Sequence, residues 1–324
     1  MTLLCMILLF TSCKKSKRNL EEDIKLDFSQ KLNPSAQNIA VISKNDVYYF
    51  SDLKYSPARV TNTPNEVKTN IKVSYDGSKV AFLNATGYVE IWKTSGELVE
   101  ELTNYYNPTC FNWSANGETL YLLVGNTINF YGPSLKIPDL TNDGVKLSNI
   151  FNGYVEVSAV AISPRLDILY SYTIRTSSGY YGYTYEANTV FKEAGSTEEV
   201  ILSTNSSSYS DVTSASDLNF ANATNDMLIS ISNPSYDSNY SNSLVSELNV
   251  YYYKSKSLRT RITNSYNMVN PVFRSDLSLY VSGTRGYSSD NFVLTLNRAY
   301  NSQTPAKTLS DYSGTDETFY CDWK

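Results

Sequence analysis

Carboxylates, tyrosine hydroxyls and a few thiols are the side chains of this sequence that could do chemistry. Histidine is absent from all 324 residues. Its absence excludes a Ser-His-Asp or Cys-His nucleophile, a histidine-ligated zinc ion and acid–base catalysis by imidazole. No glycine-rich phosphate loop is found between a strand and a helix. We therefore expect no metal site and no cofactor.

The thiols add little to this chemistry. Of the four cysteines, Cys5 and Cys13 belong to an apolar N-terminal segment. Cys110 and Cys321 each come shortly before a tryptophan, in separate copies of the repeat that organises the chain. Side chains on separate repeats would lie too far apart for a disulfide. We expect two free, buried thiols.

Carboxylate chemistry stays open, because two acidic side chains can together hydrolyse a glycosidic bond. The aspartates that the sequence allows us to place, Asp76, Asp167 and Asp276, fall in short turns between apolar runs. In such turns an aspartate accepts hydrogen bonds from the nearby backbone. A structural role is the better interpretation, and the sequence predicts that the protein is not an enzyme.

The turns belong to a repeated pattern of strand, tight turn and strand. Asn107 to Gly132 places Trp113 before a Ser-Ala-Asn-Gly turn, and a continuous apolar run follows; Ile71 to Trp92 has the same layout. An Asn-Gly or Asp-Gly step between apolar runs predicts a hairpin. The anchors of successive copies are Val73, Trp113, Ile162, Phe220, Phe273 and Trp323, which are 40 to 58 residues apart. Repeats of about 40–50 residues with four strands each are typical of β-propeller blades.

The motif aromatic-Ser-x-Asp/Asn-Gly-x-x-apolar-aromatic, with a later strand ending in Trp or Tyr, resembles the repeat of TolB-like, WD-like β-propellers. The resemblance covers residues 38–324 and implies an all-β fold, a six-bladed β-propeller of four-stranded antiparallel blades. Trp323 would open a blade that lacks three strands, which Ile39 to Ser43, Val47 to Ser51 and Ala58 to Asn62 would supply. We expect the C-terminal strand to pair with the N-terminal strands and close the ring, so that no strand edge is left open at the ends.

The first residues predict export. The run MTLLCMILLF is too short to span a bilayer, and Phe10-Thr11-Ser12-Cys13 resembles a bacterial lipobox. This implies a lipoprotein signal peptide at 1–12, lipidation of Cys13, a flexible tether at 13–37 and a β-propeller domain at 38–324. It also implies a cell-envelope location, as an outer membrane lipoprotein that faces the periplasm or the surface. The alternative is a chance apolar N-terminus on a cytosolic protein.

Charge and tyrosine content limit the partners. The formal net charge is −5 and 18% of the residues are charged, so we expect no basic face and no nucleic acid partner. Three long tyrosine-containing segments, Arg175 to Asn188, Asn233 to Asn249 and Gly283 to Asn291, separate predicted second and third strands. In this fold such connections emerge on one face. The predicted binding residues there are Tyr180, Tyr181, Tyr183, Tyr185, Tyr236, Tyr240 and Tyr287.

Tyrosine with serine, glycine and asparagine is the composition that recognition loops favour, because the ring gives contact area at a low entropy cost. Such a sector could anchor a protein partner or stack on a glycan. Two alternatives remain. Propeller loops tolerate insertions that have no function. The competing site is the channel mouth around Asn112, Asp217, Asn219 and Asp322.

Three functional hypotheses follow. The first is a non-catalytic, lipid-anchored propeller that binds another envelope protein, as the resemblance to TolB-like domains implies. The second is a carbohydrate-binding surface lipoprotein that uses the tyrosine-rich loops. The third is a lyase or glycosidase with two carboxylates in the channel.

Overall fold

Runs of β-branched and aromatic residues between turn residues form the strands of this chain, as their preference for extended backbone predicts. The structure is a computed structural model that describes residues 38–43, 45–51, 57–114, 117–132, 145–146, 155–163, 165–178, 182–207, 215–220, 227–236, 244–264, 266–273, 279–285, 291–296, 303–308 and 320–323. They belong to one unit, Ala36–Lys324. The predicted signal peptide, Cys13 and the tether lie outside the described residues.

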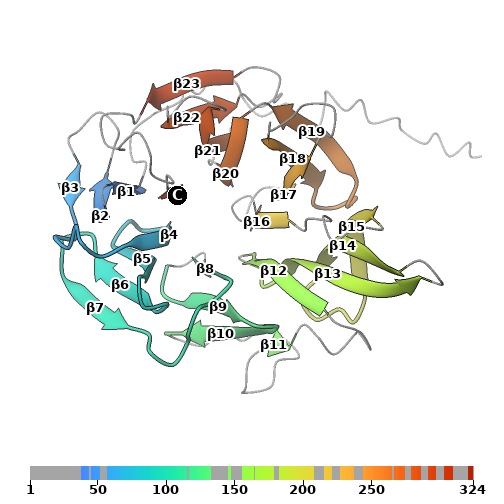
Figure 1. Cartoon of the computed structure of the whole chain (residues 1–324), viewed down its shortest axis with the longest axis horizontal. Coiled ribbons are helices and arrows are strands. Elements are labelled where there is room, and N and C mark those ends of the chain that lie inside the picture. Colours follow the sequence, from blue (N-terminus) through green and yellow to red (C-terminus); the bar gives the residue numbers. More distant parts are fainter. Residues whose placement is uncertain are drawn as a thin grey trace, which may run out of the picture. The chain divides into compact units, whose positions relative to one another are not determined.

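The described strands form six four-stranded antiparallel sheets, which we name A to F (Figure 1). Sheet A is β24 (Tyr320–Trp323), β1 (Ile39–Ser43), β2 (Asp46–Phe50) and β3 (Ala58–Arg59). Sheet B is β4 (Lys68–Val73), β5 (Lys79–Asn84), β6 (Val89–Lys93) and β7 (Leu98–Glu101). Sheet C is β8 (Cys110–Trp113), β9 (Leu120–Val124), β10 (Thr127–Tyr131) and β11 (Val145–Lys146).

The other three sheets have longer strands. Sheet D is β12 (Val155–Ile162), β13 (Ile168–Ser178), β14 (Gly182–Lys192) and β15 (Glu199–Ser207). Sheet E is β16 (Ala215–Phe220), β17 (Met227–Tyr236), β18 (Leu244–Tyr252) and β19 (Leu258–Asn264). Sheet F is β20 (Tyr266–Phe273), β21 (Leu279–Arg285), β22 (Asn291–Leu296) and β23 (Gln303–Thr308). The predicted all-β, antiparallel class is therefore confirmed. None of the described residues forms a helix long and apolar enough to cross a membrane.

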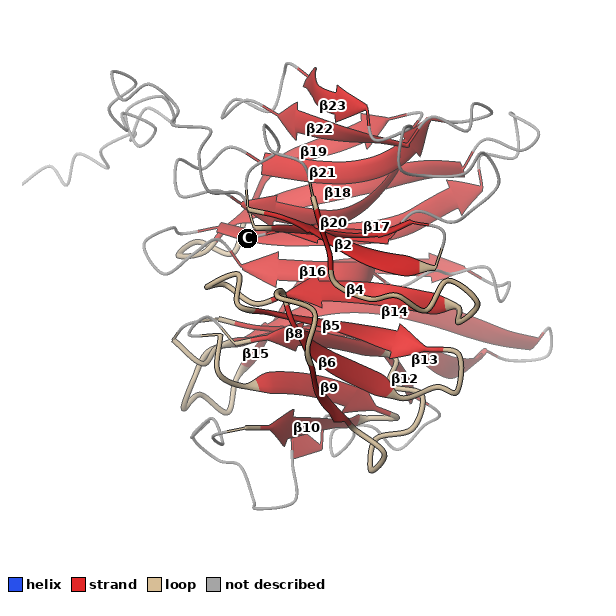
Figure 2. Ribbon diagram, turned by 90° about the vertical axis from the view of Figure 1, so that its left-hand side faces the viewer, coloured by secondary structure: helices blue, strands red, loops and turns tan. Residues whose placement is uncertain are grey.

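Apolar residues on both faces of the second strands of sheets B, C and D, which are β5, β9 and β13, explain how these sheets pack. In β5, Val80 and Phe82 join a buried cluster shared by sheets A and B, whereas Ala81 joins a cluster shared by sheets B and C. Two further clusters lie between sheets C and D and between sheets D and E. A strand buried on both faces must be apolar at consecutive positions. This is why the sequence shows continuous apolar runs instead of an alternating pattern. Figure 2 shows the strands of successive sheets stacked face to face.

The first strand of each sheet contacts the first strand of the next. The contacts run from β24 to β4, β8, β12, β16 and β20, and from β20 back to β24. Figure 1 shows these strands around one centre. β24 pairs with β1 in register, from Ile39 opposite Trp323 to Ile42 opposite Tyr320. This is the pairing of the two chain ends that the sequence predicted.

The repeated turn after the first strand has one geometry in sheets B, C and D. The amide of the fourth turn residue donates to the carbonyl of the first, at 2.9 Å for Gly77 to Ser74, 2.8 Å for Gly117 to Ser114 and 2.9 Å for Leu166 to Ser163. All three donors have left-handed backbone, with φ of 69°, 73° and 70°. Glycine adopts this conformation freely, but leucine at 166 is strained by roughly 1–2 kcal/mol. Sheet D therefore keeps the turn after losing its glycine.

Every outer strand for which the structure describes several paired residues carries a register shift. Shifts occur in the β6–β7, β14–β15, β18–β19 and β22–β23 pairs. A bulge bends an edge strand and leaves one residue unpaired, which hinders the addition of a further strand. The bulges therefore hinder unspecific pairing of other strands with the outer edges of these sheets.

Candidate functional site

The tyrosines predicted to form a binding sector lie on strands as well as between them. Tyr183 and Tyr185 belong to β14, and Tyr236 is the last residue of β17. Tyr180, Tyr181, Tyr240 and Tyr287 lie outside the described residues. Tyr185 is half-buried, and the side chain of Tyr183 lies outside what the structure describes.

Two of the long segments that were expected to be loops, 175–188 and 233–249, are mostly strand, and the third, 283–291, is strand at its two ends. In sheet D, Arg175–Ser178 pairs with Gly182–Tyr185, which leaves only residues 179–181 as the connection. In sheets E and F the corresponding connections are residues 237–243 and 286–290. The expectation of loops was wrong for the other residues. Alternating tyrosine and threonine favours extended backbone, and pairing across the hairpin satisfies the backbone groups.

Two tyrosines of β13 face a carboxylate across sheet D. Tyr170 and Tyr172 stack with ring centroids 5.9 Å apart. Burial, and then the nearby Glu199 carboxylate, raise the pKa of both hydroxyls. Phenols held in the protonated form cannot act as bases near neutral pH. These tyrosines contribute packing to the cluster between sheets C and D.

The predicted channel-mouth aspartate, Asp322, is buried and joins β24 to sheet B. Its Oδ2 accepts a hydrogen bond from the Val73 amide at 2.8 Å, and its Oδ1 lies 3.8 Å from Lys72 Nζ. Burial, and then Asp322, raise the pKa of Tyr75 to about 12. The carboxylate therefore has a positive and a hydrogen-bonding partner on β4. This arrangement ties the C-terminal strand β24 to β4 of the next sheet.

Of the other residues predicted at the channel mouth, the structure describes some with their side chains and some by their backbone alone. Asn112 is buried, and its Oδ1 accepts the amide of Trp113 at 2.9 Å. Asp217 and Asn219 lie on β16, opposite Ile231 and Ile229 in register. Their side chains lie outside the described residues. Cys110, on β8, is half-buried and is not part of a disulfide.

The turn aspartate of sheet D holds sheets D and E together. Asp167, which is 1% exposed, accepts hydrogen bonds from Ser163 Oγ at 2.8 Å, from the Ala194 amide at 2.9 Å and from the Tyr253 hydroxyl at 2.5 Å. Two cations lie near the Tyr253 ring, with Lys256 Nζ at 3.9 Å and Arg165 Cζ at 5.1 Å from its centroid. Burial and Asp167 raise the pKa of Tyr253. As predicted, this aspartate has a structural role.

The turn aspartate of sheet B bonds within its own turn. Asp76 accepts from Ser74 Oγ at 2.6 Å and from the Ser78 amide at 3.0 Å and hydroxyl at 2.7 Å. Asp276 lies outside the described residues. Among the residues that the structure describes, no three acidic, cysteine or histidine side chains come together as metal ligands would.

Sequence reasoning missed the apolar residues of two outer strands. All four residues of β7 are exposed, with Leu98 at 49% and Val99 at 41%. In β15, Val200 is 38% exposed and Ile201 58% exposed. A usable signal was present, because each pair of branched apolar residues lies beside glutamates in a short segment after a turn. The sequence alone does not show whether such a pair is exposed, because this depends on whether another element packs outside the strand.

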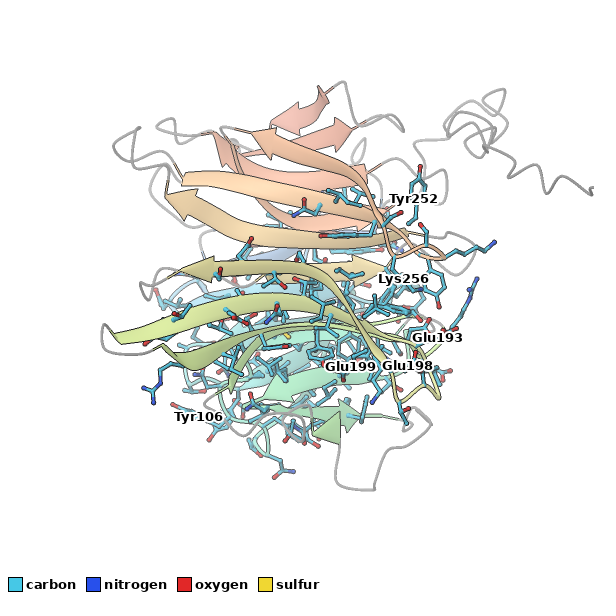
Figure 3. All side chains as sticks on the ribbon, turned by 90° about the vertical axis from the view of Figure 1, so that its right-hand side faces the viewer. Tyr106, Glu193, Glu198, Glu199, Tyr252 and Lys256 are labelled. Carbon is cyan, nitrogen blue, oxygen red and sulfur yellow. The ribbon has the colours of Figure 1, made fainter. Side chains whose placement is uncertain are left out.

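A single exposed aromatic residue was missed as well. Tyr106, between β7 and β8, is 64% exposed, and its ring meets the ring of Tyr88 edge to face at 5.6 Å between centroids. Figure 3 shows Tyr106 on the side of the molecule opposite Glu193 and Lys256. It therefore lies at the other end of the strands from the turn aspartate of sheet D.

Comparison with known proteins identifies the fold. No protein-family model and no curated protein matches the chain. Among solved structures, a chain from the crystal structure of a nidogen/laminin complex is similar, with a TM-score of 0.56 and 10% identity over 89% of this chain and 98% of that one. An oligogalacturonate lyase in complex with manganese has a TM-score of 0.48 at 8% identity, over 85% of this chain and 74% of that one. The dihydro-heme d1 dehydrogenase NirN has a TM-score of 0.41 at 14% identity, over 90% and 76%. Together with the sheet architecture, the first likeness shows a fold of the β-propeller type.

Proposed function

We propose that this chain is a non-catalytic binding scaffold, a closed six-bladed propeller of the TolB-like kind that is anchored to the outer membrane through lipidated Cys13 and recruits another envelope protein. The single observation that carries the scaffold role is the exposure of branched apolar side chains on the outer strands β7 and β15. Side chains of this kind on rigid strands are suited to contact an apolar patch of a partner, because little entropy is lost when they are covered.

The closed ring is supported by two features of the fold. The contacts of the first strands return to β24, and β24 completes the sheet of β1, β2 and β3. A closed ring gives the outer strands a rigid support. The similar chain from the nidogen/laminin complex was solved together with a protein partner, which is compatible with a scaffold role here.

The described polar groups favour binding over catalysis. Asp322 and Asp167 are each bonded to backbone and to side chains of neighbouring strands. The described tyrosines with shifted pKa values all have them raised. The two aspartates join neighbouring strands, and tyrosines with raised pKa values stay protonated and cannot act as bases near neutral pH.

The scaffold role is tested by affinity capture of the tagged chain from its own envelope. We expect Ile201→Asp to lower the recovery of the captured partner at least about tenfold, because a charge replaces an apolar contact that binding would bury. The matched control is Asn205→Asp on the same exposed strand, which adds the same charge to a polar position and should leave recovery within twofold. Equal recovery with both variants, or no specific partner for the parent chain, would contradict the proposal.

The lipid anchor has a separate test. Cells that express the chain are fed a clickable palmitate analogue, and the purified protein is probed for the label. We expect labelled protein from the parent chain and none from Cys13→Ser, because only a cysteine at the end of a lipobox is lipidated. Cys110→Ser is the matched control and should label like the parent. Label in Cys13→Ser, or none in the parent, would remove the lipoprotein assignment.

A further inference from the structure

We propose that Tyr106, with Tyr88 beside it, is a stacking platform for an uncharged sugar. This site is separate from the outer-strand surface proposed above, and neither proposal depends on the other. Tyr106 has the highest exposed fraction, 64%, among the large hydrophobic side chains that the structure describes. An exposed flat ring presents an apolar face and a polar hydroxyl, and the ring is rigid.

The loop that carries Tyr106 is held by backbone hydrogen bonds on both sides of the residue. The Tyr105 amide donates to the Leu102 carbonyl at 3.2 Å, and the Asn107 amide donates to the Gly87 carbonyl at 2.7 Å. The Tyr105 side chain packs against the buried cluster between sheets B and C. Because Tyr105 is anchored inward, Tyr106 is directed outward on a preset loop. A ligand would not have to order this loop on binding.

Contacts with Gly87 and Tyr88 also fix the position of the Tyr106 ring. A Cβ atom at Gly87 would lie 2.9 Å from Tyr106 Cε2, so the ring rests directly on the glycine backbone. Gly87 has φ of 85°, which other residues rarely adopt. The interplanar angle of 68° with Tyr88 is the edge-to-face arrangement that aromatic pairs prefer. The hydrogen-bonded loop, Gly87 and the Tyr88 ring together hold the Tyr106 ring in one orientation.

The surroundings of the ring favour a neutral sugar. The exposed residues of the two turns that meet here are mostly uncharged hydrogen-bonding ones: Thr86, Thr103, Asn104 and Asn107. The nearby carboxylates Glu90 and Glu101 both accept hydrogen bonds from Asn84 Nδ2, at 2.9 and 2.8 Å. A pyranose matches this chemistry, because its C–H face can lie on the ring while its hydroxyls reach amide and hydroxyl groups.

If Tyr106 were the anchor of a protein–protein interface, its surroundings would be different. Aromatic anchors at protein interfaces are surrounded by further side chains that exclude water. The exposed apolar residues of sheet B, Leu98 and Val99, lie at the far end of β7, because Leu98 pairs with Trp92 whereas Glu101 pairs with Glu90 near Gly87. Tyr106 is an isolated aromatic ring among polar neighbours, so the sugar is the occupant that we favour.

The test is affinity electrophoresis of the folded chain in native gels that contain laminarin, galactomannan or xyloglucan. We expect at least one of these neutral polysaccharides to retard the parent chain. Tyr106→Ala should weaken that retardation at least about tenfold, as expected for the loss of one aromatic anchor. Tyr106→Phe keeps the ring and should stay within threefold of the parent.

Three results would overturn the sugar platform. They are no retardation by any of the three polysaccharides, equal retardation of Tyr106→Ala and the parent, and retardation only in a gel with the anionic polygalacturonate. Thermal melting of both variants checks that the fold is intact. Because the Tyr106 side chain is exposed, we expect both variants to melt close to the parent. Partner capture by Tyr106→Ala should remain at the level of the parent, so that failure here is distinguishable from failure of the scaffold proposal.

Discussion

Replacing Asp322 by alanine is expected to lower the free energy of unfolding by about 3 kcal/mol. The substitution removes the acceptor of the Val73 amide and the carboxylate that lies 3.8 Å from Lys72 Nζ, a side chain that is 15% exposed. An unpaired buried amide costs roughly 1–3 kcal/mol, and a buried charge that loses its partner costs more. Urea unfolding followed by tryptophan fluorescence measures the change.

Asp322→Asn is the matched variant for this measurement. The amide keeps an oxygen for the Val73 amide but has no charge for Lys72, so about half of the loss should remain. Because Asp322 lies on the last strand and Val73 on β4, the effect would report how strongly the C-terminal strand is tied to the next sheet. An alanine variant within about 0.5 kcal/mol of the parent would show that the contact does not stabilise the fold.

The two turn aspartates should differ in their effect on stability. Asp167→Ala is expected to cost about 3–4 kcal/mol, because the buried Ser163 and Tyr253 hydroxyls and the Ala194 amide lose their acceptor together. Asp76→Ala should cost only about 1 kcal/mol, because the Asp76 carboxylate is exposed and water replaces it. The measurement is again urea unfolding, with the parent chain as reference.

The Asp76 effect should also depend on pH. Burial tends to raise the pKa of Asp76, but hydrogen bonds from Ser74 and Ser78 outweigh burial and lower it below the usual value of 3.8. A carboxyl group with a lowered folded-state pKa stabilises fully above its unfolded pKa, and this stabilisation is lost as the pH falls through the folded pKa. The difference between the parent and Asp76→Ala should therefore shrink below about pH 4. Equal losses of unfolding free energy for Asp167→Ala and Asp76→Ala at neutral pH would contradict the distinction between them. Asp167 joins two sheets, whereas Asp76 forms hydrogen bonds within its own turn.

Local signals in the sequence were sufficient to predict the hairpins, whereas the pairing of β24 with β1 was predicted from the incomplete last copy of the repeat. The Asp-Gly and Asn-Gly turns place Gly77 and Gly117 where left-handed backbone is needed, and the structure has them there. Trp323, read as the start of an incomplete sheet, lies opposite Ile39. The hairpins depend on turn chemistry and apolar runs, which act over a few residues.

Other features depend on contacts that a single sequence does not reveal. Leu166 takes the left-handed turn position of sheet D because the flanking strands impose it, although nothing in its own propensity indicates this. Tyr183 and Tyr185 looked like loop residues by composition, but pairing with β13 makes them strand. Leu98 and Ile201 are apolar and yet exposed, because none of the elements that the structure describes packs outside their strands. Tyr106 became a candidate only through its exposure and its contact with Gly87 and Tyr88.

A disulfide engineered between the two chain ends tests whether β24 pairs with β1 and closes the ring. Val41 lies opposite Cys321 in the β1–β24 pair, and directly opposite residues of antiparallel strands are about 4.5–5.5 Å apart between Cα atoms, within the range of a disulfide. In a chain whose other cysteines are replaced by serine, Val41→Cys should form an intramolecular disulfide with Cys321 under mild oxidation, seen by mass spectrometry of the non-reduced digest. Ile42→Cys, one position along and on the other face of the strand, should not form it. Absence of the cross-link in Val41→Cys, or equal cross-linking of both variants, would contradict the pairing of the two ends and with it the closed propeller.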